Sequence, residues 1–357
     1  MLKPRPAITG LRPYHSPIVS RDGLSLDLNE SMAGCSPRVL ARLRCLTAAD
    51  VSLYPEREAG ERLVASFLRV APEQVLLTNG MDEALSLLFA TYLGEGDELL
   101  FADPTFVMYQ MLGAALGAIS VRVPSDEDLA LPTAALLAAI TPRTRVIAIA
   151  NPNNPTGLAA SRADLLKIVE AAPDAAVVID EAYFEFCAAS LTCKTLLPDL
   201  AQHPNLFIGR TFSKAYGLAG IRLGVFIGAA EQIEYLRRLS LPFNVNSVAL
   251  ACLEEALADR VFVSEHVAQV KRGRERLEKL FDELGLRYWP SQTNFVLVRV
   301  GAKAKAFVES MRRRSVLVRD SSANPGCDGC VRITVGTPEQ MDEVLTAIRE
   351  AVVEIGR

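Results

Sequence analysis

The sequence predicts an α/β fold in which a mostly parallel β-sheet is covered by helices on both faces. The first observation is that the central part contains short, unbroken apolar runs, which are typical of strands buried on both sides. The second is that a segment with apolar residues at helical spacing follows the first of these runs. The third is size, because 357 residues, 50% of them hydrophobic, suffice for two domains with buried cores.

The first predicted strand is 75–78, and the turn signal Asn79-Gly80 follows it. A helix is expected next, because apolar side chains recur at i, i+3, i+4 and i+7 and because Asp82 and Glu83 suit its first turn. These apolar side chains are Leu85, Leu88, Phe89 and Tyr92. Further strands are predicted at 98–102, 145–150, 176–180, 206–210 and 221–228.

The last third of the chain changes character and predicts a separate α+β unit. Long helices with charged faces are expected between about 249 and 284. The elements expected after them are a strand at 294–300, a helix at 302–314, strands at 316–319 and 331–335, and a helix from 338 towards 355. We therefore expect an N-terminal segment, 1–50, that docks on a small C-terminal α+β domain, 246–357, and a large domain, 51–245.

Composition excludes several classes of protein. The formal net charge is −4, so no basic stripe indicates a nucleic-acid partner. The longest unbroken apolar run, 134–140, is far shorter than the roughly 20 residues that a membrane span needs. The N-terminus lacks the apolar stretch and cleavage site of a signal peptide. We therefore expect a cytoplasmic protein with no membrane contact.

Cysteine and histidine provide little reactive chemistry. The seven cysteines are odd in number and widely spread, which does not resemble a disulfide framework. Cys327 and Cys330 form a lone C-x-x-C pair, but zinc needs further ligands, and the pair precedes a predicted strand rather than a helix. We interpret them as reduced thiols in a turn. The three histidines are scattered, so we expect no metal site.

Polar residues follow several of the predicted strands, where open α/β sheets bind their ligands. They stand at Asn79-Gly80, 151–157, 180–183 and 210–214. No G-x-G-x-x-G follows the first strand, and the chain has no G-x-x-x-x-G-K-[ST], which disfavours a dinucleotide or a P-loop nucleotide.

Each of these segments has an ordinary explanation when it is taken alone. The Asn- and Pro-rich segment can be a plain loop, Asp180 a helix cap, and Lys214 a solvated lysine. In series, they match what an aldehyde cofactor requires. Such a cofactor needs a lysine amine for a Schiff base, a carboxylate that holds a proton on the ring nitrogen, and a helix start with hydroxyls and an arginine for its phosphate.

In this series of motifs, the chain resembles the fold-type-I pyridoxal-phosphate aminotransferases and, more narrowly, the histidinol-phosphate aminotransferase family. The resemblance covers nearly the whole chain in the order of the family's motifs. It rests on residues 26–30, 54–55, 78–83, 103–106, 151–157, 180–183, 210–224, 242–246, 292–295 and 331–337.

The resemblance implies pyridoxal 5'-phosphate as cofactor and assigns residues to it. Lys214 is implied as the Schiff-base lysine and proton shuttle, and Asp180 as the partner of the ring nitrogen. Asn154 and Tyr183 are implied at the ring's phenolate oxygen, and Phe106, where the family more often has Tyr, against the ring face. The residues implied at the phosphate are Thr211, Ser213, Arg222 and the backbone around Met81 and Asp82.

The resemblance also implies a substrate site that a homodimer completes. Arg332 resembles the family's main anion-binding arginine, and Arg319 a second arginine near the substrate's phosphate. Tyr54 resembles a tyrosine that reaches across the dimer interface. Tyr14 and Asn29 match N-terminal positions that close over the substrate, although Tyr14 can equally be a packing residue.

The activity implied is transamination between L-histidinol phosphate and 2-oxoglutarate in histidine biosynthesis. An aromatic-amino-acid aminotransferase and an amino-acid-phosphate decarboxylase remain alternatives, because the strand-end residues serve the cofactor and not the substrate side chain. A non-enzymatic regulator that binds pyridoxal phosphate is the alternative from a different class.

Overall fold

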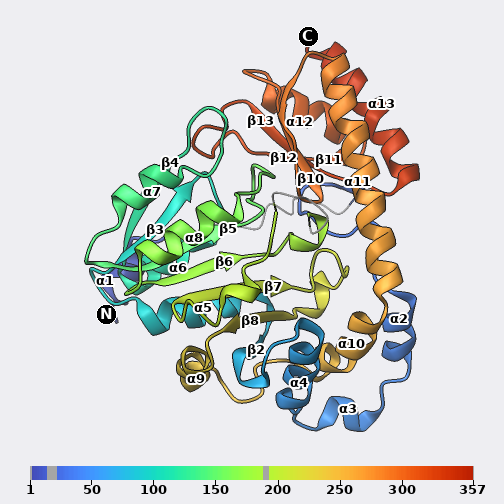
Figure 1. Ribbon diagram of the computed structural model, residues 1–357. Coiled ribbons are helices and arrows are strands. Elements are labelled where there is room, and N and C mark those ends of the chain that lie inside the picture. The colour runs from blue at the N-terminus through green and yellow to red at the C-terminus, as the bar shows by residue number, and fades with distance from the viewer. Residues whose placement is uncertain (1, 14–21, 188–192, 357) are drawn as a thin grey trace.

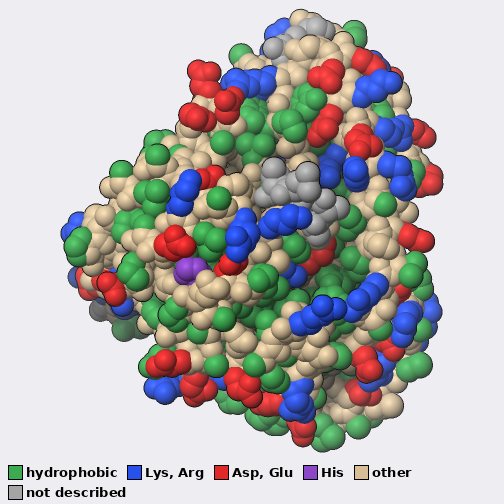
Figure 2. Space-filling view, in the orientation of Figure 1, with side chains coloured by type: hydrophobic (Ala, Val, Ile, Leu, Met, Phe, Trp, Pro, Cys, Tyr) green, Lys and Arg blue, Asp and Glu red, His purple; other side chains and the backbone are tan. Residues whose placement is uncertain are grey.

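The computed structural model describes residues 2–13, 22–187 and 193–356. Its elements form two main sheets with separate layers of helices, and a third sheet of two short strands (Figure 1). In Figure 1 the C-terminal elements lie at the top, and the larger sheet lies below them. Figure 2 shows acidic and basic side chains mixed over this face of the molecule. No helix within the described ranges is long and apolar enough to cross a membrane.

The larger sheet has seven strands in the order β2-β8-β7-β6-β5-β3-β4. Neighbouring strands run parallel except at β8, which is antiparallel to both β2 and β7. The strands are β2 Val75–Thr78, β3 Glu98–Asp103, β4 Ile119–Pro124, β5 Thr144–Ala150, β6 Ala176–Asp180, β7 Leu206–Thr211 and β8 Gly224–Gly228. The predicted mostly parallel sheet is confirmed.

Helices cover both faces of this sheet, as the unbroken apolar strands predict. In β6, Val177 and Ile179 pack into one core and Val178 into the opposite one, since side chains alternate along a strand. The face of Val178 is covered by α5 Gly80–Tyr92, α6 Met108–Leu116 and α9 Ala230–Leu239. The other face is covered by α4 Arg57–Leu68, α7 Thr133–Ala139, α8 Arg162–Ala171 and α10 Ser247–Ala258.

The C-terminal part contains an antiparallel sheet of four strands in the order β12-β13-β10-β9. Its strands are β9 Arg287–Trp289, β10 Phe295–Arg299, β12 Arg319–Asp320 and β13 Cys330–Thr334. Its helices are α11 Arg260–Glu283, α12 Ala304–Arg313 and α13 Pro338–Glu354. Apolar side chains of these helices and of β10 and β13 form the second core.

The first 50 residues contact several parts of the molecule. Helix α1, Pro6–Thr9, packs on α6, and β1, Leu24–Ser25, pairs in parallel with β11, Val316–Leu317. Helices α2, Pro37–Arg44, and α3, Ala48–Ser52, pack against α10. The division of the chain into domains, with docking of this segment on the C-terminal one, stays a prediction.

Two predicted strands differ from the structure, and strands β1, β4 and β9 were not expected. Strand β8 begins at Gly224 rather than 221, because residues 219–221 form a 3₁₀ turn and Arg222 has a φ of 58°. The predicted strand 316–319 is split between β11 and β12, which belong to different sheets. Strand β4 was not expected; it is an edge strand with partial burial, so its sequence shows no continuous apolar run.

The cysteines are mostly free thiols. Cys187 and Cys193 form a disulfide, a pairing that the sequence did not indicate. Cys327 and Cys330 are free and buried. As the sequence predicts, the two thiols stand at a turn, which leads into β13. The backbone N–H of Cys330 donates to the Cys327 carbonyl at 2.8 Å and closes this turn.

Candidate active site

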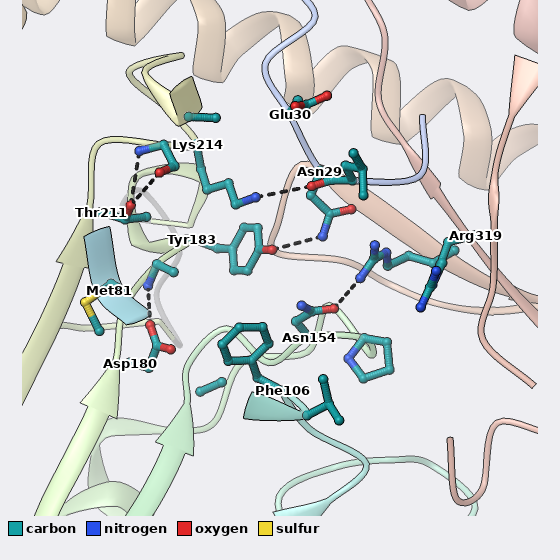
Figure 3. A pocket seen from close by; sticks show the side chains of 18 of the residues that line it. Asn29, Glu30, Met81, Phe106, Asn154, Asp180, Tyr183, Thr211, Lys214 and Arg319 are labelled. Atoms are coloured by element: carbon teal, nitrogen blue, oxygen red, sulfur yellow. Dashed lines mark hydrogen bonds between the residues drawn. The ribbon is translucent and has the colours of Figure 1, made fainter. Parts of the chain in front are cut away.

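A pocket of about 520 Å³ lies where strands β5, β6 and β7 end, beside β12 and β13 of the second sheet (Figure 3). Most of the predicted site residues line it. They are Asn29, Met81, Asp82, Phe106, Asn154, Asp180, Tyr183, Thr211, Ser213, Lys214, Arg222, Arg319 and Arg332. Residues from distant parts of the chain therefore meet at one site, although their individual roles stay predictions.

Lys214 follows β7 on a tight turn that directs its amine into the pocket. The N–H of Gly217 donates to the Lys214 carbonyl at 3.1 Å and closes this turn. The Lys214 Nζ donates to the Leu28 carbonyl at 3.3 Å and lies 5.8 Å from the Tyr183 ring centre. Burial of the amine, followed by the cation of Arg332, lowers the Lys214 pKa to about 8. Roughly a tenth of this amine is therefore unprotonated at pH 7, far more than for a solvent-exposed lysine, and the unprotonated form acts as a nucleophile or base.

Asp180 is the last residue of β6, and it is almost completely buried. Its Oδ1 accepts from the N–H of Ala182 at 3.1 Å, and its Oδ2 accepts from the hydroxyl of Tyr109 at 3.0 Å. Burial raises the Asp180 pKa to about 6 against these hydrogen bonds. The carboxylate is thus mostly ionised at pH 7, and it retains lone pairs for a protonated nitrogen.

Tyr183 and Asn154 are each oriented by a partner from another part of the chain. The Asn29 side-chain N–H donates to the Tyr183 hydroxyl at 2.9 Å (Figure 3). The Arg332 guanidinium donates to Asn154 Oδ1 at 2.6 Å and to the Asp27 carbonyl at 2.6 Å. These contacts hold the Tyr183 hydroxyl and the Asn154 amide at the pocket wall, where both can donate to a ligand oxygen.

The start of α5 forms an anion cradle with two hydroxyls and an arginine. The Thr211 hydroxyl donates to Ser213 Oγ at 3.0 Å, and the Arg222 guanidinium lies 3.5 Å from the same oxygen. Arg222 also donates to Asp82 Oδ2 at 3.1 Å. Gly80 has a φ of 77°, and a Cβ on it would lie 2.5 Å from the Arg222 guanidinium. The backbone therefore approaches the arginine closely, and the N–H groups of the helix start suit a phosphate.

Apolar side chains form the rest of the cofactor side of the pocket. Phe106 lines it, and the Phe106 ring packs edge-on against Tyr109 with centres 5.7 Å apart. The Met81 side chain packs into the core beside Gly209. A ligand would therefore contact mainly the backbone of Met81.

Arg319 and Arg332 form the other wall of the pocket, and Figure 3 shows Arg319 there. They stand directly opposite each other on the antiparallel strands β12 and β13. Like charges in this position repel, and an anion between them removes the repulsion. In the part of the chain that is described, Arg319 has no ion pair with Asp320 or another acid. The pair therefore presents two cations to a ligand anion.

Of the two remaining predicted residues, only Tyr54 is described, and it does not line the pocket. Tyr14 lies outside the described residues. Tyr54 lies at the surface, is 79% exposed and stacks on Phe243 with ring centres 4.4 Å apart. The surface position of Tyr54 keeps it out of the pocket of its own chain.

The structure adds site residues that the sequence did not single out. Tyr109 has the clearest effect, because its hydroxyl donates to Asp180. The feature of the sequence that could have indicated Tyr109 is its place three residues after Phe106, at the start of a helix. Glu30, Ser321 and Asn324 also line the pocket. Ser321 and Asn324 lie in a loop without regular structure, where no periodicity marks them.

The donor set fits pyridoxal phosphate. The pocket combines an amine of lowered pKa, a buried carboxylate, donors beside an aromatic wall and a cradle for a phosphate. Within the described ranges, no group of His, Cys, Asp and Glu side chains could hold a metal ion.

Known proteins resemble the chain along most of its length. The sequence profile of aminotransferase class I and II matches residues 21–348. Histidinol-phosphate aminotransferase 1 of a Bacillus cereus strain is 38% identical, over 93% of this chain and 89% of the relative. The histidinol-phosphate aminotransferase of Moorella thermoacetica is 35% identical, over 98% and 92% of the two chains. The crystal structure of histidinol-phosphate aminotransferase from Sinorhizobium meliloti in complex with pyridoxal-5'-phosphate has a TM-score of 0.92 and 26% identity, and covers 100% of this chain and 99% of that chain.

The lowered pKa of Lys214 predicts a specific pH dependence for covalent capture of pyridoxal phosphate by the apoprotein. Because the unprotonated amine reacts, the rate should rise about tenfold per pH unit below pH 8 and level off above it. Stopped-flow absorbance measures this rate. Arg332→Gln removes a cation that lowers the pKa, so its plateau should begin at higher pH. A wild-type rate that keeps rising to pH 10, as for a free lysine, contradicts the assignment.

Proposed function

The chain belongs to the class I and II aminotransferases, and on this premise we propose that it transfers the amino group between L-histidinol phosphate and 2-oxoglutarate with pyridoxal 5'-phosphate as cofactor. This reaction is a step of histidine biosynthesis. The observation that carries the choice of substrate is the cross-strand pair Arg319 and Arg332, which faces the pocket with two cations. The names of the relatives at 35% and 38% identity support the same choice.

Different residues of the pocket are assigned to different parts of the cofactor. Pyridoxal phosphate, when bound, supplies an aldehyde carbon and a ring that withdraws electrons. Asp180 would hold a proton on the ring nitrogen, because its carboxylate is mostly ionised, buried and fixed by Tyr109. Tyr183 and Asn154 would donate to the ring's phenolate oxygen, and Phe106 would cover one side of the ring.

Lys214 moves the proton of the reaction. Its Nζ is unprotonated in roughly a tenth of the molecules at pH 7, and the turn that ends at Gly217 fixes its backbone. From this position the amine can take the proton from the α-carbon of the amino donor. The nearby cations, Arg332 first among them, keep Lys214 from holding that proton strongly.

The two arginines suit a site that takes different anions in turn. Arg332 is fixed by Asn154 and Asp27, so it offers a rigid donor edge to the phosphate of one substrate and to a carboxylate of the other. Arg319 is assigned to the phosphate of histidinol phosphate. An aromatic amino-acid donor has one carboxylate and no phosphate, so it offers less negative charge to the two cations than histidinol phosphate with 2-oxoglutarate does. An amino-acid-phosphate decarboxylase would release CO₂ from its substrate. A pyridoxal-phosphate-binding regulator would show neither activity.

We also propose a homodimer in which Tyr54 completes the site of the partner. Tyr54 is exposed and stacks on Phe243, which is exposed too. Val51 and Leu53, close to Tyr54 in sequence, and Leu241, close to Phe243, are further exposed apolar side chains. An exposed apolar surface of this kind is typical of an interface. A second copy of the chain would cover it and would bring a tyrosine hydroxyl to the neighbouring site.

The proposal predicts that Arg319→Ala damages the reaction of the phosphate donor most. Loss of one charged partner at an interface costs on the order of 2 kcal/mol or more, which is roughly 30-fold in kcat/KM. We expect such a loss for L-histidinol phosphate and less than about threefold for phosphate-free aromatic donors. Half-reactions with a panel of donors, followed by stopped-flow absorbance, measure both values.

Matched variants separate charge from general damage. Arg319→Lys should recover part of the activity with the phosphate donor, and Arg312→Ala, on the exposed surface of α12, should behave as the wild type. Equal, small losses for every donor in Arg319→Ala would refute recognition of the phosphate and favour the aromatic aminotransferase. Release of CO₂ from an amino-acid phosphate would favour the decarboxylase.

The dimer proposal predicts complementation between chains. Tyr54→Phe should weaken activity without unfolding the protein, because the side chain is at the surface. When Tyr54→Phe and Lys214→Ala chains are mixed, one site of each heterodimer contains an intact Lys214 and an intact Tyr54, so activity should rise above that of either parent. Native mass spectrometry verifies the heterodimer. A verified heterodimer without such recovery rules out a shared site.

A further inference from the structure

His266 connects two segments of the pocket that lie far apart in the sequence. It is on α11 and is only 5% exposed. Its Nδ1 lies 2.9 Å from the carbonyl oxygen of Ala215, the residue after Lys214. Its Nε2 lies 3.3 Å from Ser31 Oγ. One imidazole therefore contacts both the turn that carries Lys214 and the N-terminal strap, which we define as residues 27–36.

The two contacts require different roles from the two ring nitrogens. A carbonyl oxygen only accepts, so Nδ1 carries a hydrogen and donates to Ala215. Burial lowers the His266 pKa, which favours the neutral ring, so Nε2 is an acceptor for the Ser31 hydroxyl. That hydroxyl also lies 2.9 Å from the Gly34 carbonyl and has one hydrogen to share between the two acceptors. His266 thus holds the Lys214 turn as a donor and the strap as an acceptor.

The strap touches the Lys214 turn directly as well. Gly217 has a φ of 68°, and a Cβ on it would lie 1.8 Å from the Gly34 carbonyl oxygen. The two backbones are therefore in close contact, with no space for a side chain between them. His266 lies beside this contact and adds the hydrogen bonds that a glycine pair does not provide.

Both segments held by His266 carry groups that face the cofactor. On the strap, the Leu28 carbonyl accepts from Lys214 Nζ, and Asn29 donates to the Tyr183 hydroxyl. On the turn, the Lys214 amine is the proposed base. A shift of the strap relative to the turn would change the position of the amine against Tyr183, and an error of about 1 Å at a reacting group can cost on the order of 100-fold in rate.

We propose that His266 is a positioning residue that fixes the N-terminal strap to the Lys214 turn and thereby sets where the Lys214 amine stands. This inference rests on the proposed function for the role of Lys214. The edge-on packing of Phe186 against the His266 ring, with centres 5.8 Å apart, restrains the imidazole in the same orientation. The residue touches neither substrate nor cofactor, and it acts through Ala215 and Ser31.

Two amide variants separate the two contacts. The amide nitrogen of His266→Asn can take the place of Nδ1 and keep the bond to Ala215, but it does not reach Ser31. The longer side chain of His266→Gln can reach Ser31, but it places no donor at Ala215. Ser31→Ala removes the strap contact from the other side. His203→Asn is the control, since its ring makes no hydrogen bond within the described part of the chain and does not line the pocket.

The variants are compared as holoenzymes with two measurements besides activity. The pH titration of the yellow, lysine-bound cofactor reports the surroundings of Lys214, and hydrogen exchange of peptides from 27–36 reports the strap. We expect His266→Gln to move the titration midpoint by roughly half a pH unit and to lower kcat roughly 3- to 10-fold. We expect His266→Asn and Ser31→Ala to move the midpoint in the same direction but by a smaller amount, and to speed exchange of the strap roughly 3- to 10-fold.

The outcomes separate this inference from its alternatives. If both amide variants lower the melting temperature alike and leave the midpoint and the exchange of the strap unchanged, His266 is only a packing residue, and the inference is wrong. If the effects of His266→Asn and Ser31→Ala on activity and on exchange of the strap simply add in the double variant, the two side chains are not coupled. That result also contradicts the inference. A wild type that forms no yellow species refutes the proposed function instead, while the exchange of the strap still tests the link through Ser31.

Discussion

Burial of an amine and a carboxylate in one pocket is the constraint on which the rest of the site depends. Lys214 and Asp180 are not paired with each other; burial lowers the pKa of the first to about 8 and raises that of the second to about 6. An isolated buried charge is costly, so each group needs its own support. Tyr109 and the Ala182 N–H give that support to Asp180, and the Leu28 carbonyl gives it to Lys214.

The sheet and the N-terminal strap supply these supports from opposite sides. Strands β6 and β7 end side by side, which places Asp180 and the Lys214 turn at the same edge. The strap crosses above that edge, and the Asn29 carbonyl accepts a 3.1 Å hydrogen bond from the side chain of Asn294, which directly precedes β10. The second sheet adds Arg332 and Arg319. The excess of cations at this wall explains why the site suits anionic substrates, since an anion relieves both their mutual repulsion and their effect on Lys214.

The sequence predicted the sheet well because strands buried on both faces leave unbroken apolar runs, as in β5, β6 and β7. It missed β4, whose exposed edge leaves no such run, and it joined β11 to β12, because nothing in residues 316–319 marks a change of sheet. The polar residues at the strand ends correctly indicated which residues line the cofactor side of the pocket. Tyr109 and His266 escaped prediction, since each acts through a contact between segments that are distant in sequence, and only the fold reveals such contacts.

The most direct test of this account is to identify the residue that binds the cofactor. The holoenzyme is reduced with borohydride, digested, and its phosphopyridoxyl peptide is mapped by mass spectrometry. The account predicts one modified residue, Lys214, and no modified peptide from Lys214→Arg. An adduct on another lysine, or a wild type that binds pyridoxal phosphate without any adduct, would contradict the central claim that this buried amine is the reactive group.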